Sequence, residues 1–298
     1  MSETRFLSWT IGDVRVTRVQ EMSVPFDPTM LFVDTPPARV LSHDWLRPHF
    51  AFDDGNLHLS IHAFVIETEG KRVLVDTCVG NTKERPGTPF HHLDTGFIDD
   101  LAAAGFPPES IDMVLCTHMH VDHVGWNTRL VDGAWVPTFP NARYLFARTE
   151  WEHWDAAARA EAEGGEGGLH ADAVIGDSVR PIFSAGLADL VESTHRVTGE
   201  VSLEPTPGHT PGHVSVRISS HGKEAVITGD MIHHPIQCAE PEICTHFCTM
   251  PDVAVETRRA FFARHEGGPV LVLGTHFAGP SGGHVKRDGA TWRFVPLT

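Results

Sequence analysis

The stretch CTHMHVDHVGW at residues 116–126 constrains the fold of this chain more than any other feature. It places His118, His120, Asp122 and His123 directly after the apolar run DMVLC. Because 21 of the 298 residues are histidine, a chance cluster has to be weighed against a metal site. Imidazole and carboxylate groups both suit zinc-like metals, and α/β sheets bind ligands where strands end. The position after an apolar run therefore favours a metal site.

Three later segments carry further residues of the same kind. His209 lies in the turn of EPTPGHTPGHVSV, before an apolar run, and Asp230 and His276 end the apolar runs of AVITGD and VLVLGTH. The motif at 116–126 alone leaves a metal site short of ligands, and these three residues complete the set. A structural histidine more often stands singly on a helix or loop surface.

Charge and composition exclude several classes of function. The formal net charge of −16 repels phosphate backbones, so we expect no nucleic-acid partner. No run of about 18 apolar residues predicts a membrane span, and the N-terminal residues lack the apolar core of a signal peptide. Cys78 and Cys116 lie in apolar runs, as reduced buried thiols do. Together these features predict a cytoplasmic protein.

The distribution of apolar residues predicts the α/β class. Strands outnumber helices, and strand pairs alternate with single helices, which indicates mixed sheets covered by helices rather than a doubly wound parallel sheet. Strands are expected at 13–19, 59–67, 71–76, 112–117, 142–147, 213–219, 224–230 and 269–275. Helices are expected at 94–105, at 148–163 before a flexible GGEGG tip, and at 251–268, where Thr249 and Asp252 resemble a capping box.

We expect one domain over residues 1–298 with two unusual segments. Residues 20–58 contain five prolines, which are expected to exclude regular helix and central strand, so this segment is predicted to be a loop. Its aromatic side chains need cover from a substrate pocket, the core, or a second subunit in a homodimer. Residues 148–195 are expected to form a helical and glycine-rich insertion.

Four motifs follow one another along the chain: THMHVDH, TPGHTPGH, TGD and GTH. This ordered set resembles the metallo-β-lactamase superfamily, and the resemblance covers residues 59–280. The resemblance implies an αβ/βα sandwich of two mixed sheets flanked by helices, with two metals at the sheet edges. It implies that His118, His120 and His209 hold one metal, that Asp122, His123 and His276 hold the other, and that Asp230 bridges them. Asp76 is implied to support the ligand loop, and His213 is assigned a structural role.

The ligand pattern separates branches of that family. Asp230 argues against true β-lactamases, His120 against flavodiiron proteins, and the 22 residues after His276 are too few for the helical region of glyoxalase II. The net charge argues against the nucleases. The remaining group contains lactonases, esterases and phosphotriesterases, and the longer passages of this chain resemble the branch with methyl parathion hydrolases and YtnP-type lactonases.

The function expected from this resemblance is hydrolysis of a small-molecule lactone or carboxylic ester by a metal-bridging hydroxide. Two divalent ions are implied, with zinc first and manganese, cobalt or iron as alternatives. Asp122 is expected to protonate the leaving alkoxide. Acyl-homoserine lactonases have a tyrosine where this chain has His233, so either His233 polarises the substrate or the substrate is not that lactone. The alternative for His233 and His234 is that both are solvated loop histidines.

Other interpretations remain open at this stage. They are a phosphotriesterase, a mononuclear iron persulfide dioxygenase, and a non-catalytic metal-binding protein. The segment CAEPEICTHFC contains Cys238, Cys244, His246 and Cys248, which form either a separate zinc site or ordinary loop thiols. Because the spacing lacks a C-x₂-C knuckle, we prefer ordinary thiols.

Overall fold

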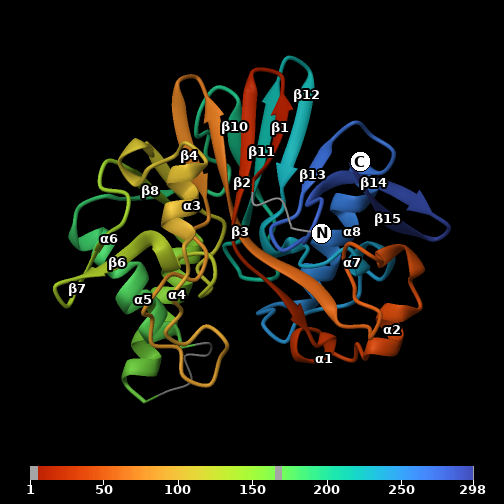
Figure 1. Ribbon diagram of the computed structural model, residues 1–298, viewed down its shortest axis with the longest axis horizontal. Helices are drawn as coiled ribbons and strands as arrows, with labels where there is room; N and C mark the ends of the chain where they lie inside the picture. Colours follow the sequence, from red (N-terminus) through yellow and green to blue (C-terminus); the bar gives the residue numbers. More distant parts are fainter. Residues whose placement is uncertain (1–5, 165–169, 298) are drawn as a thin grey trace.

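A computed structural model describes residues 6–164 and 170–297 of the chain. Two sheets pack face to face, and helices cover the outer face of each (Figure 1). The arrangement is the expected αβ/βα sandwich of mixed sheets. The GGEGG segment that was expected to form a flexible tip lies outside the described residues from Gly165 onward.

The first sheet has the strand order β1-β2-β3-β4-β5-β8-β9. Its strands are β1 (Phe6–Ile11), β2 (Val14–Phe26), β3 (Leu57–Thr68), β4 (Lys71–Val75), β5 (Met113–Cys116), β8 (Arg143–Ala147) and β9 (Ala188–Val191). Strands β1 to β4 pair in antiparallel fashion, whereas β4, β5, β8 and β9 are parallel. Parallel pairing places the carboxyl ends of β4 and β5 side by side.

The second sheet has the order β10-β11-β12-β13-β14-β15. Its strands are β10 (Val201–Pro205), β11 (Val214–Ser220), β12 (Lys223–Ile227), β13 (Leu271–Leu273), β14 (Gly282–Asp288) and β15 (Thr291–Pro296). Only β12 and β13 are parallel, so their carboxyl ends also lie together. A separate hairpin consists of β6 (Thr128–Val131) and β7 (Ala134–Pro137).

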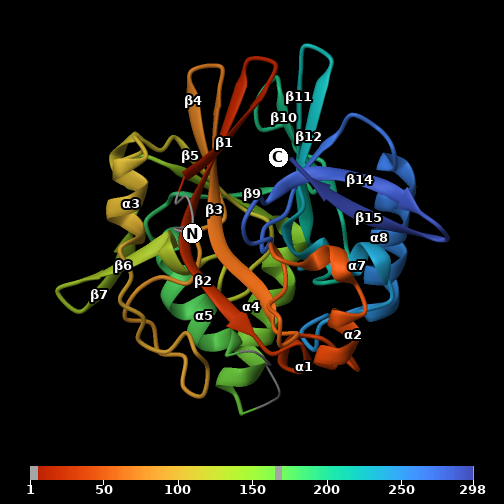
Figure 2. The same ribbon diagram turned by 45° about the vertical axis from the view of Figure 1, so that its right-hand side comes forward.

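Helices form the two outer layers (Figures 1 and 2). The first sheet is covered by α3 (Phe97–Ala103), α4 (Arg148–Ala162), α5 (Ala171–Ser178) and α6 (Arg180–Ser184). The second is covered by α1 (Pro28–Leu31), α2 (Pro37–Leu41), α7 (Ile236–Ala239) and α8 (Pro251–His265). Short 3-10 helices are η1 (Asp44–Leu46), η2 (Pro108–Ser110), η3 (Gly125–Asn127) and η4 (Gly229–Met231). Within 6–164 and 170–297, no helix is long and apolar enough to cross a membrane.

Three apolar layers hold the sandwich together. Val16 and Phe64 of the first sheet pack against Val216 and Ile227 of the second, while the outer layers cover the other faces. Strands covered on both faces explain the continuous apolar runs in the sequence. Complete burial of each such side chain contributes about 1.5–3 kcal/mol. The strand ends that carry polar side chains are therefore held on a rigid frame.

The expectation of a loop over residues 20–58 was wrong in part. β2 continues through Pro25 to Phe26, and α1 and α2 begin at prolines. Among the described residues, β2 pairs only with β3 from Gln20 onward. Proline is tolerated in such an edge strand. Proline also suits the first position of a helix, where no hydrogen-bond donor is needed. The aromatic side chains of this segment were expected to be buried in a substrate pocket, in the core or against a second subunit. Phe32 and Phe50 are buried in the core.

Two further expectations were wrong in detail. The segment 148–195 is not an insertion throughout. It contains β9, which is the edge strand of the first sheet and pairs with β8. The capping box is also absent, since α8 has Met250 at its N-cap and no side-chain cap hydrogen bond. Pro251 at the first helical position sets the start of α8 instead.

Candidate metal centre

The structure brings the seven expected ligands to one edge of the sandwich. Four of them lie in the loop after β5, His209 lies between β10 and β11, Asp230 lies in η4 after β12, and His276 follows β13. Gly229 permits the turn at Asp230, because its φ is +54° and an added Cβ would lie 2.5 Å from the His213 ring. The glycine of the TGD motif is therefore required by both backbone conformation and space.

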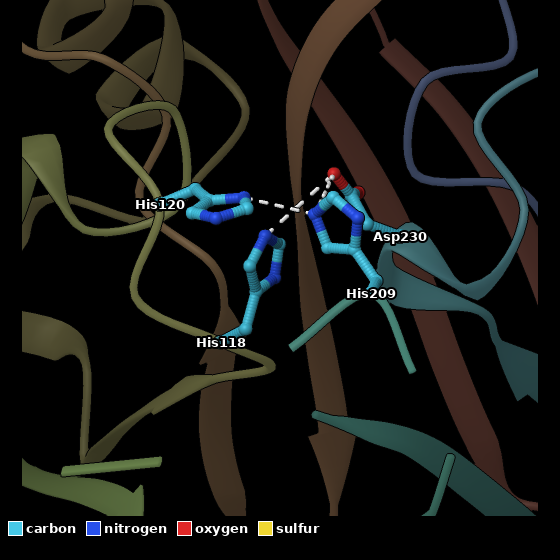
Figure 3. A group of neighbouring side chains, drawn as sticks. All are labelled: His118, His120, His209 and Asp230. Atoms are coloured by element: carbon cyan, nitrogen blue, oxygen red, sulfur yellow. Dashed lines mark hydrogen bonds and ion pairs between the residues drawn. The ribbon is translucent and has the colours of Figure 1, made fainter. Parts of the chain in front are cut away.

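The first ligand group consists of His118, His120, His209 and Asp230, whose ligand atoms lie within 4.8 Å of one another (Figure 3). His209 Nε2 lies 2.8 Å from His120 Nδ1. Asp230 Oδ2 lies 3.6 Å from His118 Nε2 and 3.4 Å from His209 Nε2. Two imidazoles of this group thus face one oxygen of the Asp230 carboxylate, and the third, that of His120, contacts His209.

The second group consists of Asp122, His123 and His276. The other oxygen of Asp230, Oδ1, lies 3.3 Å from His123 Nε2 and 3.0 Å from His276 Nε2. Asp122 Oδ2 lies 3.6 Å from His276 Nε2. The two oxygens of Asp230 therefore face two different groups, as a bridging carboxylate does.

The residues fit two divalent metal ions on structural grounds. His118 Nε2, His123 Nε2 and Asp230 Oδ1 are buried and have no hydrogen-bond partner. Leaving such atoms unsatisfied is costly, whereas metal coordination would satisfy them. Two ligand atoms bound to one tetrahedral zinc ion are about 3.4 Å apart, which is close to most distances within each group. The donor set of imidazole and carboxylate suits zinc, manganese, cobalt or iron.

Burial sets the protonation of the first group. It lowers the pKa of His118 and His209 well below the ordinary value and lowers the pKa of His120 to about 4. Burial alone would raise the pKa of Asp230, but the facing histidines hold it well below the ordinary value. Neutral imidazoles and an ionised carboxylate are the forms that bind metals.

The two histidines of the second group differ from the first group, because the pKa of both His276 and His123 is raised, most strongly that of His123. Burial would lower the pKa of His123, but the carboxylates of Asp230, Asp76 and Asp122 raise it well above the ordinary value. The surroundings of this ring therefore favour a positive charge beside it, which a bound cation would supply in place of the proton.

Asp76 supports the ligand loop. Its Oδ2 lies 2.9 Å from His123 Nδ1 and accepts a hydrogen bond from the Thr117 hydroxyl, while Oδ1 accepts from the Thr117 backbone N–H. His276 Nδ1 lies 3.1 Å from the Ser60 carbonyl oxygen. These contacts hold the rings so that Nε2 faces Asp230, an orientation typical of metal ligands.

His213 belongs to neither group. Its Nε2 accepts a hydrogen bond of 2.8 Å from the Asp230 backbone N–H, and its Nδ1 lies 3.1 Å from the Thr206 carbonyl oxygen. Burial lowers its pKa to about 3, so the ring is neutral. His213 therefore positions the backbone of Asp230, which is a structural role.

Glu150, in the first turn of α4, is a residue that the sequence did not point to. Its Oε1 accepts hydrogen bonds from Met119 N–H and Trp154 Nε1–H, and its Oε2 accepts from the Thr210 hydroxyl and Gly212 N–H. Burial raises the pKa of this carboxyl group. Glu150 thus joins the loop of His118 and His120 to the turn of His209.

His233 and His234 are buried, so they are not the solvated loop histidines considered above. His234 Nε2 lies 2.7 Å from the Phe50 carbonyl oxygen, a structural contact. His233 Nε2 lies 3.1 Å from Asp230 Oδ2, and the ring meets Phe32 edge to face. Its Nδ1 is buried and has no hydrogen-bond partner. His233 therefore lies beside both ligand groups with one nitrogen unused.

The residues of the cysteine-rich segment make other contacts. His246 Nε2 contacts the Thr29 carbonyl oxygen, and Cys238 is completely buried. Across the described ranges, no group of three potential ligands includes any of these cysteines or His246.

Comparison with known proteins identifies the family of this chain. Residues 58–244 match the family model of the metallo-beta-lactamase superfamily. The N-acyl homoserine lactonase AiiA of Bacillus thuringiensis subsp. kurstaki is 26% identical over 183 residues, which are 57% of this chain and 63% of that protein. The lactonase AttM of Rhizobium radiobacter is 31% identical over 132 residues, 44% of each chain. The match thus spans less than two thirds of these relatives.

Solved structures match over nearly the whole chain. A crystal structure of the hydrolase AbOPH in the beta lactamase superfamily has a TM-score of 0.81 and 26% identity, covering 100% of this chain and 99% of that one. AidC, a dizinc quorum-quenching lactonase in complex with a product, has a TM-score of 0.77 and 20% identity, covering 98% and 97%. Because AidC is only 20% identical, its similarity to this chain shows the fold alone. Because the family match spans more than half of its length, this chain belongs to the metallo-beta-lactamase superfamily.

Proposed function

We propose that the protein is a metal-dependent hydrolase that cleaves a small-molecule lactone or carboxylic ester. The observation that carries this proposal is Asp230, whose two carboxylate oxygens face two separate ligand groups. The relatives named above are lactonases, which supports the same reaction class.

In this proposal His118, His120 and His209 hold one divalent ion, Asp122, His123 and His276 hold a second, and Asp230 contacts both. Zinc is our first choice, because the donors suit it and AidC is a dizinc enzyme. When bound, such ions polarise an ester oxygen and lower the pKa of water towards neutrality. A mononuclear persulfide dioxygenase binds one iron. That function would leave Asp122, His123 and His276 without a metal ion to bind.

Asp122 is the proposed proton donor to the leaving alkoxide. Its side chain is 18% exposed, whereas the Asp230 side chain is 4% exposed and that of His118 is fully buried. Among the proposed ligands, Asp122 is thus the carboxylate that an incoming substrate and the solvent can both reach. An alkoxide needs this proton, but a good aryl leaving group does not.

His233 is proposed to orient the substrate. Its Nε2 faces a carboxylate, which only accepts hydrogen bonds, so Nε2 carries the proton of the neutral ring. The unused Nδ1 is then an acceptor, which fits a substrate N–H group better than a carbonyl oxygen. This assignment differs from the polarising role expected from the sequence.

For His233→Ala, we expect kcat/KM to fall about 10-fold to 100-fold, because one hydrogen bond to substrate is lost while the metal ligands remain. Steady-state kinetics with an N-acyl lactone and a lactone without an N–H group would check this. The loss should be larger for the N-acyl substrate. Equal losses on both substrates, with an unchanged metal content, would contradict the orienting role.

The function itself is tested by metal analysis followed by a substrate panel. We expect about two divalent ions per chain. Zinc, manganese and cobalt forms should be assayed with homoserine lactones, δ-lactones, aryl esters, a phosphotriester and a β-lactam. Lactone or ester hydrolysis that is lost on metal removal supports the proposal. Activity on the phosphotriester alone would favour the phosphotriesterase alternative, and metal-free protein with a native fold would reject both.

A further inference from the structure

The loop of residues 274–281, between β13 and β14, carries His276 but is held from the other sheet. Ser60 of β3 donates a backbone hydrogen bond of 3.1 Å to the His276 carbonyl oxygen, and its own carbonyl oxygen lies 3.1 Å from His276 Nδ1. The loop is closed by a hydrogen bond of 2.9 Å from Gly274 N–H to the Ser281 carbonyl oxygen. A ligand that belongs to the second sheet therefore takes its position from the first.

His62, two residues after Ser60 on β3, contacts the start of this loop. Its Nε2 lies 3.1 Å from the Gly274 carbonyl oxygen, and its Nδ1 lies 2.9 Å from Ser60 Oγ. The ring is buried, and burial together with the charge of Arg18 keeps its pKa well below the ordinary value. Because a carbonyl oxygen only accepts hydrogen bonds, Nε2 carries the proton of the neutral ring. His62 thus ties Gly274 to the strand that holds His276.

Arg18 of β2 holds the other end of the loop. The side chain is completely buried, and its Nη1 donates to the Gly279 carbonyl oxygen at 3.1 Å and to Ser281 Oγ at 2.6 Å. Ser281 Oγ in turn donates to the carbonyl oxygen of Phe277, the residue after His276. The planar guanidinium presents its donors at fixed angles, so Arg18 holds this end of the loop in one arrangement.

We propose that Arg18 and His62 are positioning residues, which fix the His276 ring for binding of the second metal ion. They clamp the loop at its two ends, and neither belongs to the ligand groups described above. Between them, His276 Nε2 lies 3.0 Å from Asp230 Oδ1, the oxygen that faces the second group. The outer partners of a ligating histidine typically contribute about 10-fold to 100-fold in metal affinity. This role rests on the proposed metal site, but not on the reaction carried out there.

Zinc titration against a competing chelator tests the role without measuring hydrolysis. Arg18→Met removes the donors to the loop and should weaken binding of one zinc ion about 10-fold to 100-fold, while the other ion binds within about 2-fold of wild type. Arg15→Met, at an exposed position on the same strand, should change neither affinity. Wild type that binds fewer than two zinc ions would overturn the positioning role. Wild type that binds two ions but cleaves no ester or lactone would overturn the proposed function alone.

A double variant distinguishes positioning from a general effect on the fold. His276→Ala should lose one zinc ion, and adding Arg18→Met should then leave the affinity for the remaining ion within about 2-fold. That result is expected if Arg18 acts only through His276. Equal weakening of both ions in Arg18→Met, or a further loss in the double variant, would overturn the proposal.

Two variants of His62 give the same test if Arg18→Met does not fold. His62→Gln keeps an N–H donor near the position of Nε2 and can still reach the Gly274 carbonyl oxygen, whereas His62→Leu has no donor. We expect zinc affinity near that of wild type for the glutamine variant, and one ion bound about 10-fold to 100-fold more weakly by the leucine variant. Thermal unfolding of the metal-free proteins would show that folded proteins are compared. Equal zinc affinities in the two variants would contradict the positioning role of His62.

Discussion

Replacing Asp230 with asparagine should lower hydrolysis by at least about 10³-fold and remove at least one metal ion per chain. The amide keeps the size of the side chain but loses its charge and presents an N–H group to one side. One ligand group would then face a donor in place of a carboxylate oxygen, since Oδ1 and Oδ2 face different groups. Metal analysis and kinetics on one preparation would show both effects.

Asp252→Asn is the matched control, because this exposed aspartate on α8 lies outside both ligand groups. It should keep full metal content and activity. The Asp230 variant should also keep its fold, because His213 bonds to the backbone of residue 230 and not to its side chain. If Asp230→Asn held both ions and hydrolysed substrate at a normal rate, the bridging role would be wrong.

The members of the candidate site could be predicted because each lies in a turn beside an apolar run. His118 follows β5 and Asp230 follows β12, and both strands have parallel neighbours. Parallel pairing places the carboxyl ends of neighbouring strands side by side. Polar residues that follow these strands in the sequence therefore lie close together in the structure. The fold class could be predicted for a similar reason, since alternating strands and helices allow few layered arrangements.

Contacts between distant segments could not be predicted in this way. Glu150 begins an ordinary helical pattern, and nothing nearby in the sequence shows that it bonds to Met119 and Gly212. The contact of Cys248 with His209 also depends on how two loops pack. The prediction of a loop over residues 20–58 is wrong at Pro25, because proline excludes only a strand that is paired on both sides, and in the described residues β2 pairs there with β3 alone. In each case tertiary packing decides what the local pattern leaves open.

Replacing Glu150 with alanine is expected to destabilise the fold by about 3–5 kcal/mol and to weaken metal binding about 10-fold to 100-fold. The change leaves four buried donors without their acceptor. Because one of these donors, Met119 N–H, lies in the loop of His120 and two lie in the turn of His209, the two segments lose their common anchor. Denaturant unfolding with and without chelator, together with a zinc titration, measures both quantities.

Two companion variants separate this anchoring role from a general effect on α4. Glu152→Ala removes an exposed carboxylate from the same helix and should change neither stability nor zinc affinity. Glu150→Gln keeps one acceptor oxygen and turns the other position into a donor, so it should fall between wild type and Glu150→Ala in both measurements. If Glu150→Ala lost stability but bound zinc as tightly as wild type, Glu150 would support the helix only. Graded losses of zinc affinity that follow the number of acceptors kept would instead identify Glu150 as the residue that positions the ligand loops.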